Sequence, residues 1–180
     1  MNIFRTHEDA LECAMDHCVP MHQNRMIIGC AQLLSTAHHV LDGENAIEGI
    51  YKQVQVDHPC SKWVRESSGN YNFVKDLANY LCILFYERTG RLHTTDAILS
   101  RLNKLPKNLV VGPETDMTPY VCVAGAPGET VYEKYRNYLN DKFSLWEKEG
   151  RKISFYRTPE WYKPALFTPP KAVKVSEGNV

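Results

Sequence analysis

The sequence lacks several patterns that would each assign a function class. It contains no Walker loop, no glycine-rich dinucleotide fingerprint and no HExxH or CxxC spacing, so neither a cofactor nor a metal is expected. Its six cysteines are scattered, which is typical of reduced thiols. No apolar run approaches the about 18 residues of a membrane span, and "MNIFRTHEDA" has no signal-peptide features. We therefore expect a cytoplasmic protein with no membrane partner.

Net charge is also absent, because the 21 basic side chains are balanced by 21 acidic ones. Proteins that bind duplex DNA through many phosphates usually carry a basic excess. Neutrality therefore favours a small nucleotide or a protein as the ligand, although DNA stays possible. The 180 residues, 43% of them apolar, suffice for one domain with a single core.

Hydrophobic periodicity predicts six helices, over residues 8–18, 23–41, 60–66, 70–90, 95–102 and 128–150. Pro20 is expected to end the first helix, and Gly90 to cap the fourth. Residues 104–128 hold four prolines and three glycines, which predicts a long loop. We predict a mostly α fold, a single compact helical bundle over residues 1–163 with a flexible tail over 164–180.

A polar stripe follows the predicted helix 23–41. Its members are Arg25, Gln32, Ser35, Thr36 and His39. Their spacing of roughly three, four or seven residues places them on one face. A face in bulk water usually holds lysines and glutamates, whereas these side chains donate or exchange protons, which favours a pocket for a phosphate or base. The alternative is a polar seam satisfied by neighbouring helices, in which His38 or His39 is an ordinary buried histidine.

A second candidate is "HPCSKWVRESSGNY", residues 58–71. In a short helix, Lys62, Arg65 and Glu66 share a face, while Trp63 points inward. Lys62 and Arg65 together would offer an anion site. The alternative is a solvated pair between Lys62 and Glu66.

The second half of that stretch begins the next predicted helix. Ser67 to Asn70 would present backbone N–H groups at its start, which is a natural place for a phosphate, with Tyr71 beside it. His58 precedes a proline and therefore has a restricted backbone.

Several stretches of residues 1–162 resemble a family of small tailed-phage proteins. The matching stretches are "NIF", "HC", "HQNRMI", "AQLLSTAHHVLDG", "HPCSKWVRESSGNY" and "TPEWY". More distantly, "SSGNYNFVKDLANYL" and "PEWYK" are similar in order to the phage pyrimidine-dimer DNA glycosylases of the endonuclease V type.

The second resemblance implies a single-domain helical bundle of the endonuclease V type. It also implies an α-amine nucleophile, a catalytic glutamate and basic residues early in the chain. Arg25 falls near one of the basic positions. His22, however, stands where the glutamate is expected, and the bulky Asn2 is expected to leave Met1 in place.

These patterns lead us to predict a phage protein that binds a host-made nucleotide immune signal, of the cyclic dinucleotide or ADP-ribose type, and degrades or sequesters it. As an enzyme it would be a metal-independent hydrolase or phosphodiesterase in which two histidines act as general base and acid, because imidazole titrates near neutrality. The predicted catalytic residues are His22, His38, His39, His58 and Tyr71. The predicted ligand-binding residues are Arg25, Gln32, Ser35, Lys62, Trp63, Arg65, Glu66, Ser67 and Asn70.

Two alternatives remain open. One is a DNA glycosylase or lyase that acts on damaged or modified pyrimidines, as the second resemblance implies. The other is a helical module that binds a host protein through the 104–128 loop and the C-terminal tail.

Overall fold

Helices make up most of the computed structural model, which describes residues 2–117 and 125–165. The described residues contain no β-strand, and their α-helices are α1 (Ala10–Met15), α2 (Asn24–Asp42), α3 (Pro59–Val64), α4 (Ser68–Thr89), α5 (Asp96–Leu102) and α7 (Val131–Lys148). The prediction of a mostly α fold is therefore confirmed. The flexible tail is predicted over residues 164–180, and all of it from residue 166 onward lies outside the described residues. Among the described helices, none combines the length and apolar character needed to cross a membrane.

The first two helices differ from their predicted bounds. The side chain of Asp9 accepts hydrogen bonds from the backbone of Leu11 and Glu12, and this cap makes α1 shorter than predicted. Pro20 does not end α1. It lies in the first turn of a π-helical segment, Val19–Gln23, that leads directly into α2. The first turn tolerates proline because its N–H groups have no intrahelical partner.

The central helix α4 ends at the glycine that its sequence predicts, but it begins at Ser68, two residues before the predicted start. The Ser67 hydroxyl caps its start by accepting from the Asn70 N–H at 3.2 Å. Gly90 ends it in the left-handed conformation, with φ of 68° and ψ of 14°. Leu77 and Leu81 of α4 are fully buried, as is Leu34 of α2, so these two helices share one core.

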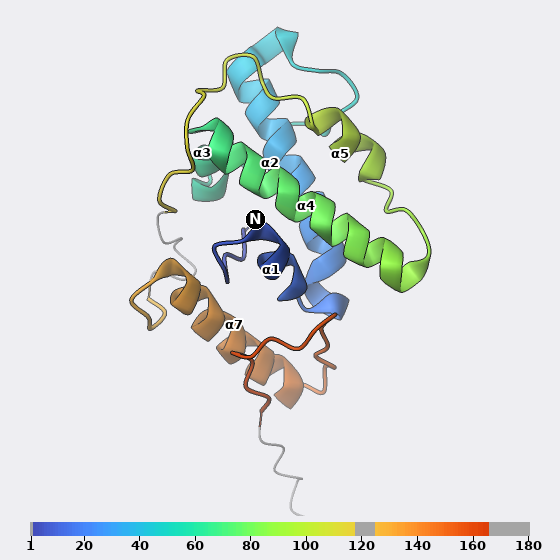
Figure 1. The fold of residues 1–180 in the computed structure, drawn as a ribbon, viewed down its shortest axis with the longest axis vertical. Helices are drawn as coiled ribbons and strands as arrows, with labels where there is room; N and C mark the ends of the chain where they lie inside the picture. Colours follow the sequence, from blue (N-terminus) through green and yellow to red (C-terminus); the bar gives the residue numbers. More distant parts are fainter. Residues whose placement is uncertain (1, 118–124, 166–180) are drawn as a thin grey trace, which may run out of the picture.

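The arrangement of the helices divides the molecule into two parts around α1. Figure 1 shows α2 to α5 on one side of α1 and α7 on the other. After α7 the chain turns back and runs along it, in orange to red in Figure 1. The Val19 N–H donates to the Ser154 carbonyl at 2.8 Å, which ties this returning segment to the start of α2.

An aromatic layer joins α7 to the rest of the molecule. Phe143 of α7 is fully buried, and its ring lies 5.6 Å from that of His22. His22 also lies 4.5 Å from the ring of Phe4 and 5.4 Å from that of Trp146. The imidazole thus fills an apolar space between the N-terminal segment and α7.

Two histidines in this region are held neutral by burial. His17 makes one hydrogen bond, between Nδ1 and the Cys13 carbonyl at 2.6 Å, and burial lowers its pKa to about 4. Neither nitrogen of His22 has a hydrogen-bond partner within the described chain, and burial lowers its pKa to about 3. A charged imidazole is disfavoured at both positions because the surroundings cannot solvate it.

We expect the free energy of unfolding to fall as the pH drops below 6.5, the ordinary histidine pKa. The folded chain holds both pKa values below that value, so the unfolded chain binds these protons first. The stability is therefore complete above pH 6.5 and is lost as the pH falls toward the folded values. Each histidine adds a slope that approaches about 1.4 kcal/mol per pH unit.

Urea titrations at several pH values, followed by circular dichroism, would measure this slope. His22→Leu should remove one histidine's share of it. Phe143→Leu opens the same layer without removing a titratable group, so it should lower stability at every pH and leave the slope unchanged. If His22→Leu and the parent chain show the same slope of unfolding free energy against pH, the attribution of this pH dependence to His22 is wrong.

Candidate functional site

Two of the predicted catalytic residues form an internal hydrogen-bonded pair. The Tyr71 hydroxyl donates to the Leu102 carbonyl at 2.8 Å and lies 3.1 Å from His38 Nε2. Both side chains are fully buried. Burial lowers the pKa of His38 and raises the pKa of Tyr71 above its ordinary value. The pair therefore joins α2, α4 and the end of α5 as neutral groups in the core.

The polar stripe of α2 is covered by the chain itself. The Ser35 hydroxyl accepts from the Tyr51 N–H at 3.2 Å, and the Thr36 hydroxyl accepts from the Val54 N–H at 3.1 Å. His39 Nε2 lies 2.9 Å from the Tyr51 carbonyl. These side chains hold residues 51–54 along α2. The stripe is therefore a polar seam satisfied by the chain itself, and not an open pocket.

The remaining stripe positions lie at or near the surface of α2. Arg25 is exposed and Gln32 is half-buried. His22, predicted as catalytic, lies one turn earlier and is enclosed by the aromatic layer. The structure therefore does not bring these three residues into one pocket with His38.

The residues of α3 use their polar groups locally. His58 caps the helix, with Nδ1 accepting from the Cys60 N–H at 3.1 Å. Arg65 donates to the Val56 carbonyl at 2.8 Å. Lys62 lies 3.5 Å from Asp57 rather than pairing with Glu66. The side chains of Arg65 and Lys62 thus each have a partner in the loop that precedes α3.

The start of α4, where a phosphate was expected, is occupied by the proline-rich loop. The Ser68 N–H donates to the Val110 carbonyl at 2.8 Å, and the Gly69 N–H donates to the Gly112 carbonyl at 3.1 Å. The next N–H, of Asn70, is bound by Ser67. The first three N–H groups of α4 therefore have partners, and the loop takes the place predicted for a ligand.

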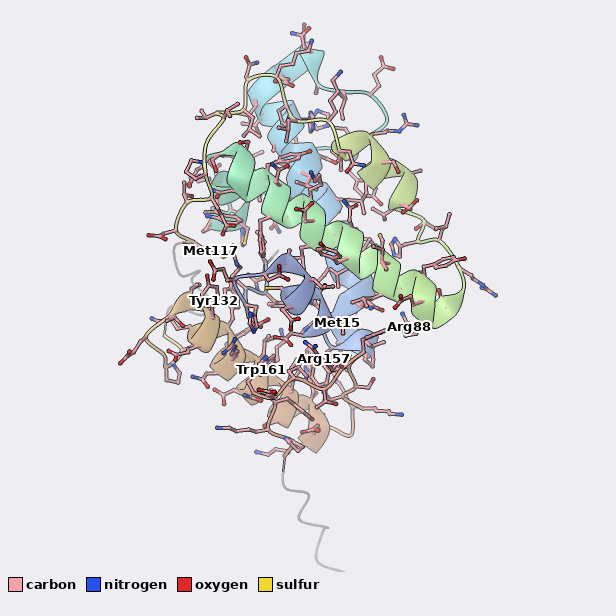
Figure 2. The ribbon with its side chains drawn as sticks, viewed as in Figure 1. Met15, Arg88, Met117, Tyr132, Arg157 and Trp161 are labelled. Atoms are coloured by element: carbon pink, nitrogen blue, oxygen red, sulfur yellow. The ribbon has the colours of Figure 1, made fainter. Side chains whose placement is uncertain are left out.

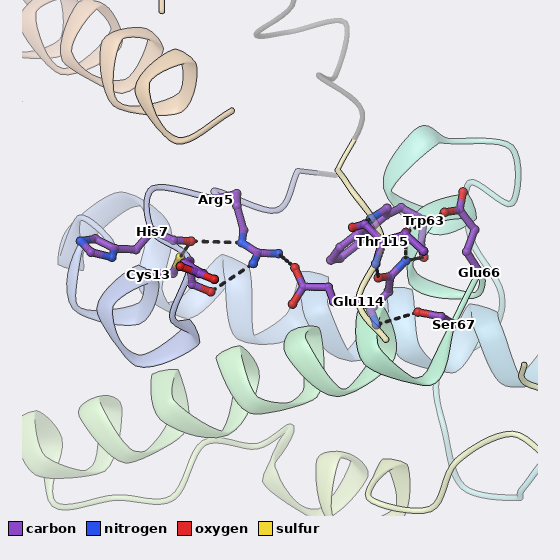
Figure 3. A network of polar contacts seen from close by, with 10 residues as sticks. Arg5, His7, Cys13, Trp63, Glu66, Ser67, Glu114 and Thr115 are labelled. Carbon is purple, nitrogen blue, oxygen red and sulfur yellow. Dashed lines mark hydrogen bonds and ion pairs between the residues drawn. The ribbon is translucent and has the colours of Figure 1, made fainter. Parts of the chain in front are cut away.

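Asn70, Trp63 and Glu66 complete this attachment of the loop at Thr115. The Asn70 amide accepts from the Thr115 N–H and donates to its hydroxyl, both at 2.8 Å. Trp63 Nε1 donates to the Thr115 carbonyl at 3.2 Å, and the Thr115 hydroxyl donates to Glu66 at 3.1 Å. Trp63, Glu66, Ser67 and Thr115 are drawn in Figure 3. Trp63 is 3% exposed, which confirms that it points inward.

A different set of residues forms an open hollow between α1, α7 and residues 157–161, with a volume of about 670 Å³. We call it the α1–α7 cleft. Its ionisable lining residues are His7, Glu12, Asp16, Arg136, Arg157 and Glu160. Trp161, Thr158 and Pro159 complete the wall. Figure 2 shows Arg157 and Trp161 between α7 and α1. The volume lies within the range of about 300–1,000 Å³ that is usual for small-molecule sites.

The side chains of the cleft are held in place by hydrogen bonds and an ion pair. Trp161 Nε1 donates to the Asp16 carboxylate at 2.8 Å. Arg136 Nε donates to the Thr6 carbonyl at 2.8 Å, and Arg157 pairs with Glu12. A ligand would therefore meet side chains that are already ordered, which lowers the entropic cost of binding.

The chemistry of the cleft is mixed. Two guanidinium groups can bind oxyanions, and three carboxylates can accept hydrogen bonds from hydroxyl or amino groups. His7 adds a group able to transfer protons. In the described part of the chain, His, Cys, Asp and Glu side chains form no group that could hold a metal ion.

Sequence reasoning missed every residue of this cleft. His7, Glu12 and Asp16 belong to the N-terminal segment, whereas Arg136 and Trp161 lie far along the chain, so no local spacing connects them. The stretch "TPEWY" was the one available signal, because it stands out as a motif. No family model, curated protein or solved structure matches this chain.

We expect Gly69→Ala to destabilise the fold by about 1–3 kcal/mol, as overpacking of a filled site does. A Cβ at Gly69 would lie 2.2 Å from the Glu114 nitrogen and 2.5 Å from the Pro113 carbonyl carbon, so the loop would have to move. A Cβ at Gly112 would meet nothing within 4 Å, so Gly112→Ala is the matched control within the same contact. Urea denaturation of both variants measures the difference. Equal stabilities would show that the loop is not pressed against α4.

Proposed function

We propose that this protein binds a nucleotide in the α1–α7 cleft and either degrades or sequesters it. The observation that carries the proposal is the combination of two arginines, three carboxylates and an indole around one hollow. An inorganic anion would use the arginines but would offer no hydrogen-bond donors to the carboxylates. A nucleotide satisfies both kinds of group, because it joins an anionic phosphate to a sugar and a base that donate hydrogen bonds.

Arg136 and Arg157 would hold the phosphate. A guanidinium binds a phosphate through two parallel N–H groups, and this geometry gives direction as well as charge. Arg136 keeps its terminal nitrogens for this role, because Nε alone binds the Thr6 carbonyl. Arg157 is exposed and already paired with Glu12, so a ligand phosphate would compete with that carboxylate.

Trp161 would stack on the base. Stacking of a base on an aromatic side chain contributes about 1–3 kcal/mol and tolerates any base. The bond from Trp161 Nε1 to Asp16 fixes the edge of the indole ring. Glu160, which is exposed at the rim, would accept from the sugar or base and give the site its selectivity.

The resemblance to tailed-phage proteins suggests the biological role. We propose that the ligand is a host-made immune signal, of the cyclic dinucleotide or ADP-ribose type, and that its removal serves counter-defence. In the enzyme form of the proposal, water attacks the phosphorus while a carboxylate of the cleft takes a proton from that water, and His7 gives a proton to the leaving oxygen as its P–O bond breaks. In the sequestering form the same residues bind without turnover.

We expect Arg157→Ala to weaken nucleotide binding at least tenfold, which corresponds to about 1.4 kcal/mol. Isothermal titration with cyclic dinucleotides and cyclic ADP-ribose isomers would measure the affinity. The matched control is Arg151→Ala, because Arg151 is also exposed and paired with one glutamate, Glu149, but does not line the cleft. Equal losses of nucleotide affinity in both variants would indicate a general charge effect and would contradict the proposed binding site.

Incubation followed by denaturation and mass spectrometry separates turnover from sequestration. We expect an altered nucleotide to be released by the parent chain, and His7→Gln to abolish this turnover while its binding stays within about threefold, a loss of less than 1 kcal/mol. Intact nucleotide recovered from the parent chain would overturn the enzyme form and support sequestration. Cleavage of abasic DNA, with an adduct trapped by borohydride, would instead support the glycosylase alternative.

A further inference from the structure

A second, smaller hollow adjoins the α1–α7 cleft on the side of α7. Its volume is about 130 Å³, and it is lined by Glu133, Arg136, Asn137, Asn140, Trp161 and Lys163. We call it the α7 hollow. Arg136 and Trp161 line both spaces, so the cleft and the hollow meet at these two side chains.

The size of the α7 hollow suits one compact group. With about 130 Å³, it is about a fifth of the size of the α1–α7 cleft, which has about 670 Å³. A tetrahedral phosphate carries four oxygens and fits this volume. The α1–α7 cleft, with about 670 Å³, has room for the larger part of a ligand.

The charge of the α7 hollow also suits a phosphate. Arg136 and Lys163 contribute two positive charges, and Lys163 is exposed, with no partner for its ammonium group among the residues described. The one carboxylate, of Glu133, already accepts from the N–H groups of Glu129 and Thr130 at 2.8 and 3.2 Å. Its charge is therefore directed to the start of α7, where it stabilises the helix.

Asn140 fixes the border between the two spaces. Its amide donates to the Trp161 carbonyl and accepts from the Lys163 N–H, both at 2.9 Å. Trp161 and Lys163 are consequently held at a constant separation on either side of Tyr162. A ligand that stacks on the indole would have its next phosphate within the reach of the Lys163 side chain.

We propose, on the basis of the nucleotide function proposed above, that the α7 hollow binds a second phosphate, so that the ligand carries two phosphates, as a 5′-phosphorylated dinucleotide does. The first nucleotide lies in the α1–α7 cleft, and the phosphate that joins it to the second nucleoside lies between Arg136 and Lys163, with the second base and sugar outside the hollow. Arg136 contacts both parts of the ligand, whereas Lys163 contacts only the second phosphate, so Lys163 is the residue that favours two phosphates over one.

The probes for this proposal are the four 5′-mononucleotides and the matching 5′-phosphorylated linear dinucleotides, measured by isothermal titration. We expect each dinucleotide to bind at least tenfold more tightly than its mononucleotide. Lys163→Ala should remove this advantage and leave mononucleotide affinity unchanged. Lys152→Ala is the matched control, because Lys152 is an exposed lysine that lines neither space.

The outcomes separate the two proposals. Mononucleotides that bind as tightly as dinucleotides, or a Lys163→Ala variant that keeps the dinucleotide advantage, would overturn the second subsite and leave the nucleotide function standing. Failure of every mononucleotide and dinucleotide to bind the parent chain would overturn both.

Discussion

The guanidinium of Arg5 is the group on which the arrangement of the N-terminal segment and the proline-rich loop depends. Its side chain is 3% exposed and pairs with Glu114 at 2.5 Å. It lies 3.6 Å from the centre of the Phe73 ring and donates to the His7 and Glu8 carbonyls at 3.1 Å. Figure 3 shows Arg5 between His7 and Glu114. Glu114 is 37% exposed, so only the arginine of this pair is buried, and loss of Glu114 would leave the guanidinium with fewer groups to solvate it.

This placement connects two regions that are far apart in sequence. Glu114 belongs to the loop that closes the start of α4, and His7 is the first residue of the α1–α7 cleft. One buried charge therefore fixes both the loop and the entry of the chain into α1. Arg5 holds the backbone of the cleft at His7, whereas the cleft side chains are held by their own hydrogen bonds and ion pair.

Most residues predicted to bind a ligand instead bind the chain's own backbone. Ser35 and Thr36 accept from residues 51 and 54, and Asn70 accepts from Thr115. The physical reason is that a backbone N–H and a ligand donor require the same acceptor. Polar side chains on a helix face that carries few charges thus indicate an enclosed hydrogen-bond partner. The sequence does not say whether that partner is a ligand or another segment of the chain.

The α1–α7 cleft combines opposite charges, as the whole chain does. Its arginines and carboxylates come from segments near both ends of the described chain, and together they are close to neutral. Long-range attraction of an anion would be weak at such a site. Selectivity would therefore depend on short hydrogen bonds and stacking, which reward a ligand with both donors and acceptors.

The sequence by itself determined the helical class, most helix positions, the inward-facing Trp63 and the end of α4 at Gly90, because these follow from periodicity and caps within a few neighbouring residues. It did not determine the role of Pro20, since a proline that can end one helix can also begin the next. Only the tertiary structure decided which polar groups remain available. It placed the 109–117 loop over the start of α4 and brought His7, Arg136 and Trp161 to one cleft. These contacts join residues that are 44 positions apart, as for Ser68 and Gly112, and 130 or more positions apart around the cleft, so packing of the whole chain selects them.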